Sequence, residues 1–166
     1  HMVLVAISGS LAILVGIPLG IWLSRPSMRD VAETMMQALN VGTTVPTLAV
    51  LALAMTILGI GIVPAVFGLW LASLLPIVRN TYQGLRSVPR HLVESAHGMG
   101  MRPRQILFRV ELPNAIFVIF AGVRTALAIN VGTAPLAFLI GGGGLGELIF
   151  TGIDLNETGM MLAGAI

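Results

Sequence analysis

Long runs without a charged side chain constrain this sequence more than any other feature. Val3–Leu23 and Val41–Val78 contain no Asp, Glu, Lys or Arg. A helix that crosses the roughly 30 Å hydrocarbon core of a bilayer needs about 20 consecutive, mostly apolar residues. The first run is long enough for one such helix and the second for two. Both runs therefore predict membrane-spanning helices.

The composition excludes the other broad classes of protein. Apolar and aromatic residues make up 56% of the 166 residues and charged residues only 10%. A typical soluble domain carries about 25% charged residues, and disordered chains combine low hydrophobicity with high charge. The sequence also lacks Cys and Lys. This excludes disulfides, cysteine–zinc sites and a P-loop, whose Lys contacts the nucleotide phosphates.

We expect one transmembrane domain over residues 1–166, with spans at 3–23, 43–58, 62–78 and 113–133. Gly59-Ile60-Gly61 and Pro64 interrupt the second uncharged run and separate its two spans. The last apolar stretch, 158–166, is too short to cross, so we expect it to be the start of a final span that is truncated in this sequence. Gly16 and Gly20 form a GxxxG pattern, which is typical of closely packed membrane helices.

The Arg residues predict the orientation. Eight of the nine lie in the segments 24–40 and 79–111, and loops rich in Arg or Lys face the cytoplasm. The amino terminus is therefore expected outside and the loop 79–112 inside. Arg25 is expected at the level of the lipid headgroups. The apolar face between Met28 and Leu39 predicts a short interfacial helix that leads into the second span.

The loop 79–112 predicts two short helices joined by a glycine turn. Ser87 is a candidate cap of the first helix, Gly100 a left-handed residue at its end, and Pro103 the start of the second. A helix–turn–helix unit also occurs in DNA-binding proteins. Its location between two spans leaves no free recognition helix, so we expect no nucleic-acid partner. A plain loop whose Arg residues only set the topology is the remaining alternative.

The spacing within this loop resembles that of a known family. Glu94-Ser95-Ala96, three residues, Gly100, nine residues and then Val110-Glu111-Leu112-Pro113 are similar to the EAA loop of ABC-importer permeases, E-A-A-x3-G-x9-I-x-L-P. Ser95 and Val110 depart from the motif, which has Ala and Ile there. The resemblance implies that the loop binds a separate ATPase. The implied ATPase-coupling residues are Glu94, Ser95, Ala96, Gly100, Val110, Leu112 and Pro113.

The resemblance extends along the chain. Leu75–Tyr82, Ala121–Ala126 and the glycine run 141–144 followed by Leu148–Phe150 are similar to permeases of osmoprotectant importers, which carry glycine betaine, choline or carnitine. The resemblance implies an all-α integral membrane protein with the five-helix core of an ABC type I importer permease, in a bacterial or archaeal inner membrane. An importer for another small solute (an amino acid, methionine or an oxyanion) and a secondary carrier stay open as alternatives.

The same resemblance implies the partners. These are cytoplasmic ATPase subunits, a second permease copy or homologue, an extracytoplasmic substrate-binding protein and the lipid bilayer. It implies no catalytic residue and no cofactor on this chain, because ATP and Mg²⁺ bind to the ATPase.

Arg124, Gly143 and Gly144 are the candidate residues of the translocation path. An Arg at the centre of a span costs about 2.5–3.5 kcal/mol on insertion scales, so we expect Arg124 to face the bundle interior or a wet cavity. A structural hydrogen bond to a backbone carbonyl or to Thr125 is the alternative role. The glycine run predicts irregular backbone, which at membrane depth occurs only against protein or water. The few His residues lack the spacing of metal ligands, so we expect no metal site.

Overall fold

The computed structural model describes residues 1–165, and the regular structure among them is helical. Leu107–Glu111 is a π-helical turn, whereas η1 and η3 are 3-10 turns. The elements in chain order are α1 (Met2–Leu23), η1 (Pro26–Met28), α2 (Arg29–Gly42), α3 (Thr47–Leu58), α4 (Ile62–Arg86), α5 (Arg90–Gly98), α6 (Pro103–Ile106), η2 (Leu107–Glu111), α7 (Leu112–Thr133), η3 (Ala134–Ile140), α8 (Gly146–Asp154) and α9 (Thr158–Ala165).

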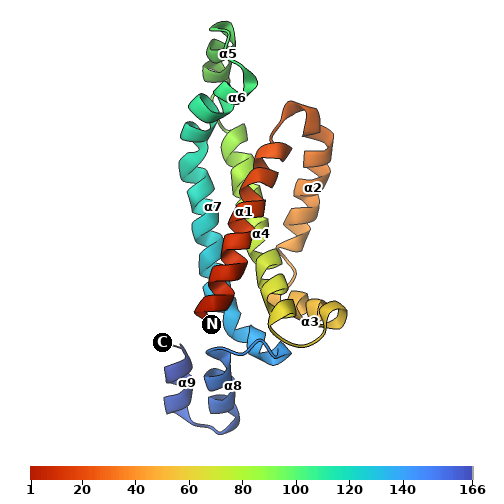
Figure 1. Cartoon of the computed structure of the whole chain (residues 1–166), viewed down its shortest axis with the longest axis vertical. Coiled ribbons are helices and arrows are strands. Elements are labelled where there is room, and N and C mark those ends of the chain that lie inside the picture. The colour runs from red at the N-terminus through yellow and green to blue at the C-terminus, as the bar shows by residue number, and fades with distance from the viewer. Residues whose placement is uncertain (166) are drawn as a thin grey trace.

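Three long apolar helical stretches form the body of the molecule (Figure 1). Helices α1 and α4 are two of them, and the third runs without a break from α6 through η2 and α7 to η3. By length and composition each is able to cross a membrane, and the bent pair of α2 and α3 makes a fourth crossing if its two halves are counted together.

The second span differs from the expected range 43–58. In the structure α3 has only 12 residues and begins at Thr47. It is bent by 102° from the helical segment that precedes it. The bend falls next to Pro46, whose ψ of 135° is extended. A proline also disfavours helical geometry at the residue before it, here Val45, so α2 does not continue into α3. The third span also differs, since α4 continues beyond 78 to Arg86.

Glycines bring α1 and α4 close together, as the GxxxG pattern predicts. A Cβ atom added to Gly16 would lie 2.8 Å from Cγ2 of Ile77, and one added to Gly20 would lie 2.5 Å from Cβ of Thr81. Only glycine permits such an approach of two backbones in a membrane bundle. On a neighbouring face of α4, Gly122 of α7 packs just as closely, with its added Cβ 2.5 Å from Cβ of Asn80. Helix α4 thus packs closely against both α1 and α7.

Helix α2 packs on the bundle and does not form the separate interfacial helix expected from the sequence. Its buried Ala32 belongs to a cluster with Leu23 of α1 and with Leu74 and Val78 of α4. Met35, Met36 and Leu39 pack against the same cluster. The apolar face of α2, which was expected to lie on the lipid surface, therefore packs against protein. Helix α2 runs alongside α4 (Figure 1).

The two ends of the bundle differ in structure (Figure 1). Helices α5 and α6 project from one end, while η3, α8, α9 and the amino terminus lie at the other. Helices α8 and α9 pack closely, since a Cβ added to Gly164 would lie 2.7 Å from Cγ1 of Ile149. The expected start of a final span, 158–166, corresponds to α9, and its residue 166 lies outside the described residues.

Candidate functional site

The projecting unit of α5 and α6 has a rigid turn at Gly100. This residue has a φ of +75°, and its N–H donates to the carbonyl of His97 at 2.9 Å. The N–H of Met101 donates to the carbonyl of Ala96 at 3.1 Å. Together the two bonds form a Schellman motif, which ends a helix at a left-handed residue. The predicted helix, glycine turn and second helix are therefore present.

Apolar packing joins this unit to the bundle. Val93 of α5, Leu107 and Leu112 pack against a buried cluster at the ends of α4 and α7. The buried members of the cluster are Leu85, Val88, Ala115 and Ile119, and Ile17 and Ile21 of α1 also pack on it. Ala96 of α5 is itself buried. The unit is thus a continuation of the core and has no flexible link to it.

The predicted coupling residues divide by exposure. Glu94, Ser95 and Gly100 are exposed on the projecting unit, and so is Pro113 at the start of α7. Val110 and Leu112 are half-buried. The exposed members on α5 and its turn are accessible to a second protein, whereas Ala96 supports the unit from inside. Their role in coupling stays a prediction.

The helix starts of this unit differ from the expectation. Ser87 does not cap α5, because its hydroxyl donates to the carbonyl of Gly84 at 2.8 Å and so belongs to the end of α4. Pro89 precedes the first residue of α5 without a side-chain cap. At α6 the backbone N–H of Arg102 donates to Oε1 of Gln105 at 2.8 Å. Pro103 follows as the first helical residue, as predicted.

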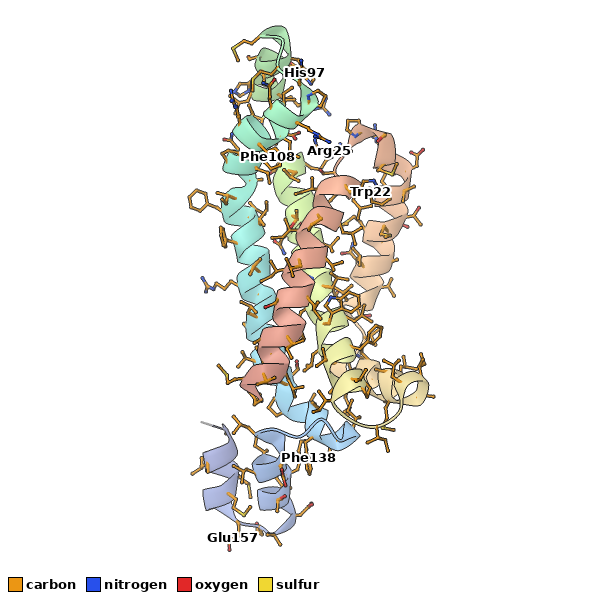
Figure 2. All side chains as sticks on the ribbon, viewed as in Figure 1. Trp22, Arg25, His97, Phe108, Phe138 and Glu157 are labelled. Carbon is orange, nitrogen blue, oxygen red and sulfur yellow. The ribbon has the colours of Figure 1, made fainter. Side chains whose placement is uncertain are left out.

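An ion pair at the base of this unit was not predicted. Nη1 of Arg25 lies 2.8 Å from Oε2 of Glu111, with 29% and 14% of the two side chains exposed. The two residues are 86 positions apart, so no local pattern signals the contact. Arg25 was expected at the lipid headgroups. In the structure it lies at the end of the bundle that also carries His97 and Phe108, opposite Phe138 and Glu157 (Figure 2).

Arg124 does not face the bundle interior. It is exposed on α7, and within residues 1–165 its guanidinium has no hydrogen-bond or ion-pair partner. The hydroxyl of Thr125 donates to the carbonyl of Ala121 at 2.9 Å and is therefore not the partner of Arg124. Within this chain α7 buries the opposite side of the helix, where Gly122 and Ala126 pack. The place of Arg124 in a translocation path stays a prediction.

The glycine run has the irregular backbone that was predicted. Gly141, Gly143 and Gly144 have φ values of 78°, 66° and 100°. The run joins η3 to α8 at the end of the molecule opposite α5 and α6 (Figure 1). Gly144 lies near the amino terminus, since its added Cβ would be 3.2 Å from the backbone nitrogen of His1. The structure therefore places Arg124 on one element and Gly143 and Gly144 on another.

A cavity of about 800 Å³ runs along α4. Its walls are mostly apolar, and they also hold a few polar side chains such as Arg79, Asn80 and Gln83. Arg124, Gly143 and Gly144 are not among the lining residues within the described part of the chain. The lining residues are Gly42, Thr43, Val45, Thr47, Val50, Leu53, Ala54, Ile57, Phe67, Leu71, Ala72, Leu75, Pro76, Arg79, Asn80, Gln83, Thr125 and Ile129.

The sequence did not reveal this cavity. Its wall combines the bend between α2 and α3 with one side of α4, and only the tertiary packing brings these together. In the part of the chain that the structure describes, no group of three or more His, Cys, Asp or Glu side chains could hold a metal ion.

Comparison with known proteins identifies the family. Residues 16–166 match the family described as the binding-protein-dependent transport system inner membrane component. The chain belongs to this family. It is therefore an ABC-importer permease component of the inner membrane, as the EAA-like spacing predicted.

Named relatives agree with this assignment. The osmoprotectant import permease protein OsmY of Salmonella typhimurium is 61% identical over 165 residues, which cover 99% of this chain and 70% of that protein. The choline transport system permease protein OpuBB of Bacillus subtilis is 44% identical over 166 residues, covering 100% of this chain and 76% of that protein. These relatives are transport permeases and not enzymes.

The fold also has a solved counterpart. A chain of the MetNI methionine ABC transporter in an inward-facing conformation superimposes with a TM-score of 0.77 at 22% sequence identity. The match covers 98% of this chain and 88% of that chain. At this identity the likeness concerns the fold alone. It confirms the predicted all-α core of an ABC type I importer permease.

Proposed function

We propose that the chain is the permease subunit of an ATP-driven importer for quaternary-ammonium osmoprotectants such as glycine betaine, choline or carnitine. The observation that carries this proposal is the 61% identity, across 99% of this chain, to an osmoprotectant import permease. Relatives named for choline and for carnitine are each 44% identical. The substrates in these names share a quaternary ammonium group, which defines the proposed class.

The proposed partners follow from the two ends of the bundle. Cytoplasmic ATPase subunits, which would bind the ATP and Mg²⁺, dock on the projecting unit through Glu94, Ser95 and Gly100, which are exposed there. A binding protein delivers substrate at the opposite end, where Gly143 and Gly144 lie. A second permease copy or homologue completes the membrane part of the importer.

Coupling in this proposal is mechanical. Closure of the ATPases on ATP displaces α5 and α6, and the buried cluster around Leu85 and Ala115 transmits the displacement to α4 and α7. A closely packed unit transmits such a movement, whereas a flexible loop would absorb it. No covalent chemistry takes place on this chain.

The cavity along α4 offers a route for the substrate. Apolar walls suit the methyl groups of a quaternary amine, and Asn80 and Gln83 supply a few polar contacts. Thr125 lines the cavity, and Arg124 directly precedes Thr125 on the exposed side of α7. We therefore keep Arg124 as a path residue of the assembled importer, together with the two glycines at the outer end.

Reconstitution tests the proposal. The permease, its ATPase and its binding protein are placed in proteoliposomes, and ATP hydrolysis is measured together with uptake of labelled choline, glycine betaine, carnitine, methionine and a sulfonate. We expect the quaternary amines to stimulate both activities. Stimulation by methionine or the sulfonate alone would assign another substrate class. Uptake driven by an ion gradient without the ATPase would indicate a secondary carrier.

A further inference from the structure

The ion pair between Arg25 and Glu111 joins the end of α1 to the helix that carries the projecting unit. Arg25 follows α1, in the membrane bundle, and Glu111 ends the π-helical turn η2 between α6 and α7. The other ion pair within the described residues, Arg29 with Glu33, is local to α2 and lies at 3.4 Å with 69% and 62% of its side chains exposed.

The guanidinium of Arg25 is held in place by more than the carboxylate. Its Nη2 donates to Oγ of Ser24 at 2.9 Å, and its Nε donates to the carbonyl of Ile21 at 3.2 Å. The hydroxyl of Ser24 in turn donates to the same carbonyl at 2.7 Å. A planar guanidinium fixed at several atoms is an oriented donor and not a mobile surface charge. The end of α1 therefore presents Nη1 to Glu111 in a defined position.

Glu111 lies in an irregular turn of the helix that carries the projecting unit. Leu107–Glu111 is π-helical, and π-turns interrupt the regular hydrogen bonding of an α-helix and occur often at functional sites. Without a support here, displacement of α5 and α6 would be absorbed by a change in this turn. The carboxylate of Glu111 connects the end of the turn to α1.

Other charged groups lie near Glu111. A cleft of about 260 Å³ between the end of α4 and α5 is lined by Glu111 and by Arg86, Arg90 and Glu94. Ser24 of α1 lines it too. The predicted coupling residue Glu94 therefore shares a cleft with Glu111, one member of the ion pair.

We propose that Arg25 and Glu111 are positioning residues for coupling: their ion pair fixes the base of the projecting unit to α1, so that a displacement of α5 and α6 moves the bundle. The proposal rests on the proposed function, because it needs an ATPase that pushes on this unit. Neither residue contacts substrate or nucleotide in this role.

The ratio of substrate imported to ATP hydrolysed measures this role. In proteoliposomes holding the complete importer, we expect Arg25→Glu to lower the ratio about tenfold, the size of effect that follows when a partly buried charge faces a like charge. The double variant Arg25→Glu/Glu111→Arg restores the pair and is expected to return the ratio to within about twofold of wild type. A purely structural contribution would lower both activities together.

Arg29→Glu is the matched control, because it makes the same change of charge in the same cytoplasmic segment at an exposed position. We expect it to leave the ratio within about twofold of wild type. A wild-type ratio for Arg25→Glu, or a double variant as uncoupled as the single one, would overturn the proposal.

If the importer with Arg25→Glu does not assemble, the milder variants Arg25→Gln and Glu111→Gln test the proposal instead. The proposal is wrong if both variants keep the wild-type ratio of substrate imported to ATP hydrolysed. A failure of the proposed function would look different. In that case the wild-type importer itself would show no ATP-driven uptake of quaternary amines.

Discussion

At the scale of single residues, backbone conformation decides which side chain the turn between α5 and α6 accepts. Gly100 has a φ of +75° and no atom within 4 Å of an added Cβ. The position therefore requires glycine for its conformation and not for space. A residue with a Cβ in this left-handed conformation costs roughly 1–2 kcal/mol. Relief of this strain would change the orientation of α5 relative to α6.

We expect Gly100→Asp to insert normally but to lower substrate uptake about tenfold, since a charge is added to the docking surface and the left-handed turn is strained, although less by Asp than by most other residues. Quantification of the membrane protein by immunoblot and uptake of labelled choline check this. Gly98→Asp is the control, because Gly98 ends α5 and also has no atom within 4 Å of an added Cβ. Wild-type uptake by Gly100→Asp would contradict the coupling role of the turn.

At the scale of elements, glycines bring α1 and α7 close to α4. Because these glycines have no side chain, side chains of α4 such as Ile77 and Thr81 pack directly on the neighbouring backbone. A buried hydrogen bond adds to the contact of α1 with α7, as Nδ2 of Asn130 donates to Oγ of Ser8 at 2.8 Å. Such bonds contribute about 0.6–2 kcal/mol in membrane bundles. Packing of small residues therefore remains the main contribution to the association of these helices.

Gly20→Ala tests this packing. The new Cβ would lie 2.5 Å from Cβ of Thr81 and 2.9 Å from the carbonyl oxygen of Val78, and overpacking of this kind costs about 1–3 kcal/mol. We expect a lower midpoint of SDS-induced unfolding in detergent micelles, followed by circular dichroism. Gly132→Ala on α7 controls for helix propensity, because nothing lies within 4 Å of its added Cβ. Equal midpoints for the two variants would rule out close packing at Gly20.

At the scale of the whole molecule, the distribution of Arg predicts one orientation in the membrane. Arg25 and the Arg residues of the projecting unit lie at one end of the bundle, and Glu157 marks the other (Figure 2). The positive-inside rule places the first end in the cytoplasm, where an ATPase would reach Glu94. The end with the glycine run then faces outward.

Single cysteines test this orientation in a chain that has no native Cys. Met99→Cys places a thiol on the projecting unit, where the native side chain is 74% exposed, and Glu157→Cys places one at the other end. We expect a membrane-impermeant maleimide to label position 157 in intact spheroplasts and position 99 only in inside-out vesicles. Labelling of position 99 in spheroplasts would mean that the chain has the opposite orientation. The proposed docking site would then lie outside the cell, where the ATPase could not reach it.

Much of the candidate site was predictable because it depends on nearby residues. The helix, left-handed glycine and second helix between Arg90 and Ile106 are encoded by capping residues and by spacing within a few turns. The close packing at Gly20 follows from a GxxxG pattern. The exposed position of Arg124 was not predictable, because the sequence does not say which side of α7 meets its neighbours.

The sequence by itself determined that the chain is an all-helical membrane protein and where the glycine turn of the projecting unit lies, since uncharged runs and glycine spacing act locally. The Arg positions predict which end faces the cytoplasm. Only the tertiary structure decided that α2 packs on the bundle, that a cavity forms along α4 and that Arg25 meets Glu111. Each of these brings together residues distant in sequence. Periodicity shows that a helix has an apolar face, but the packing of all the helices determines what covers it.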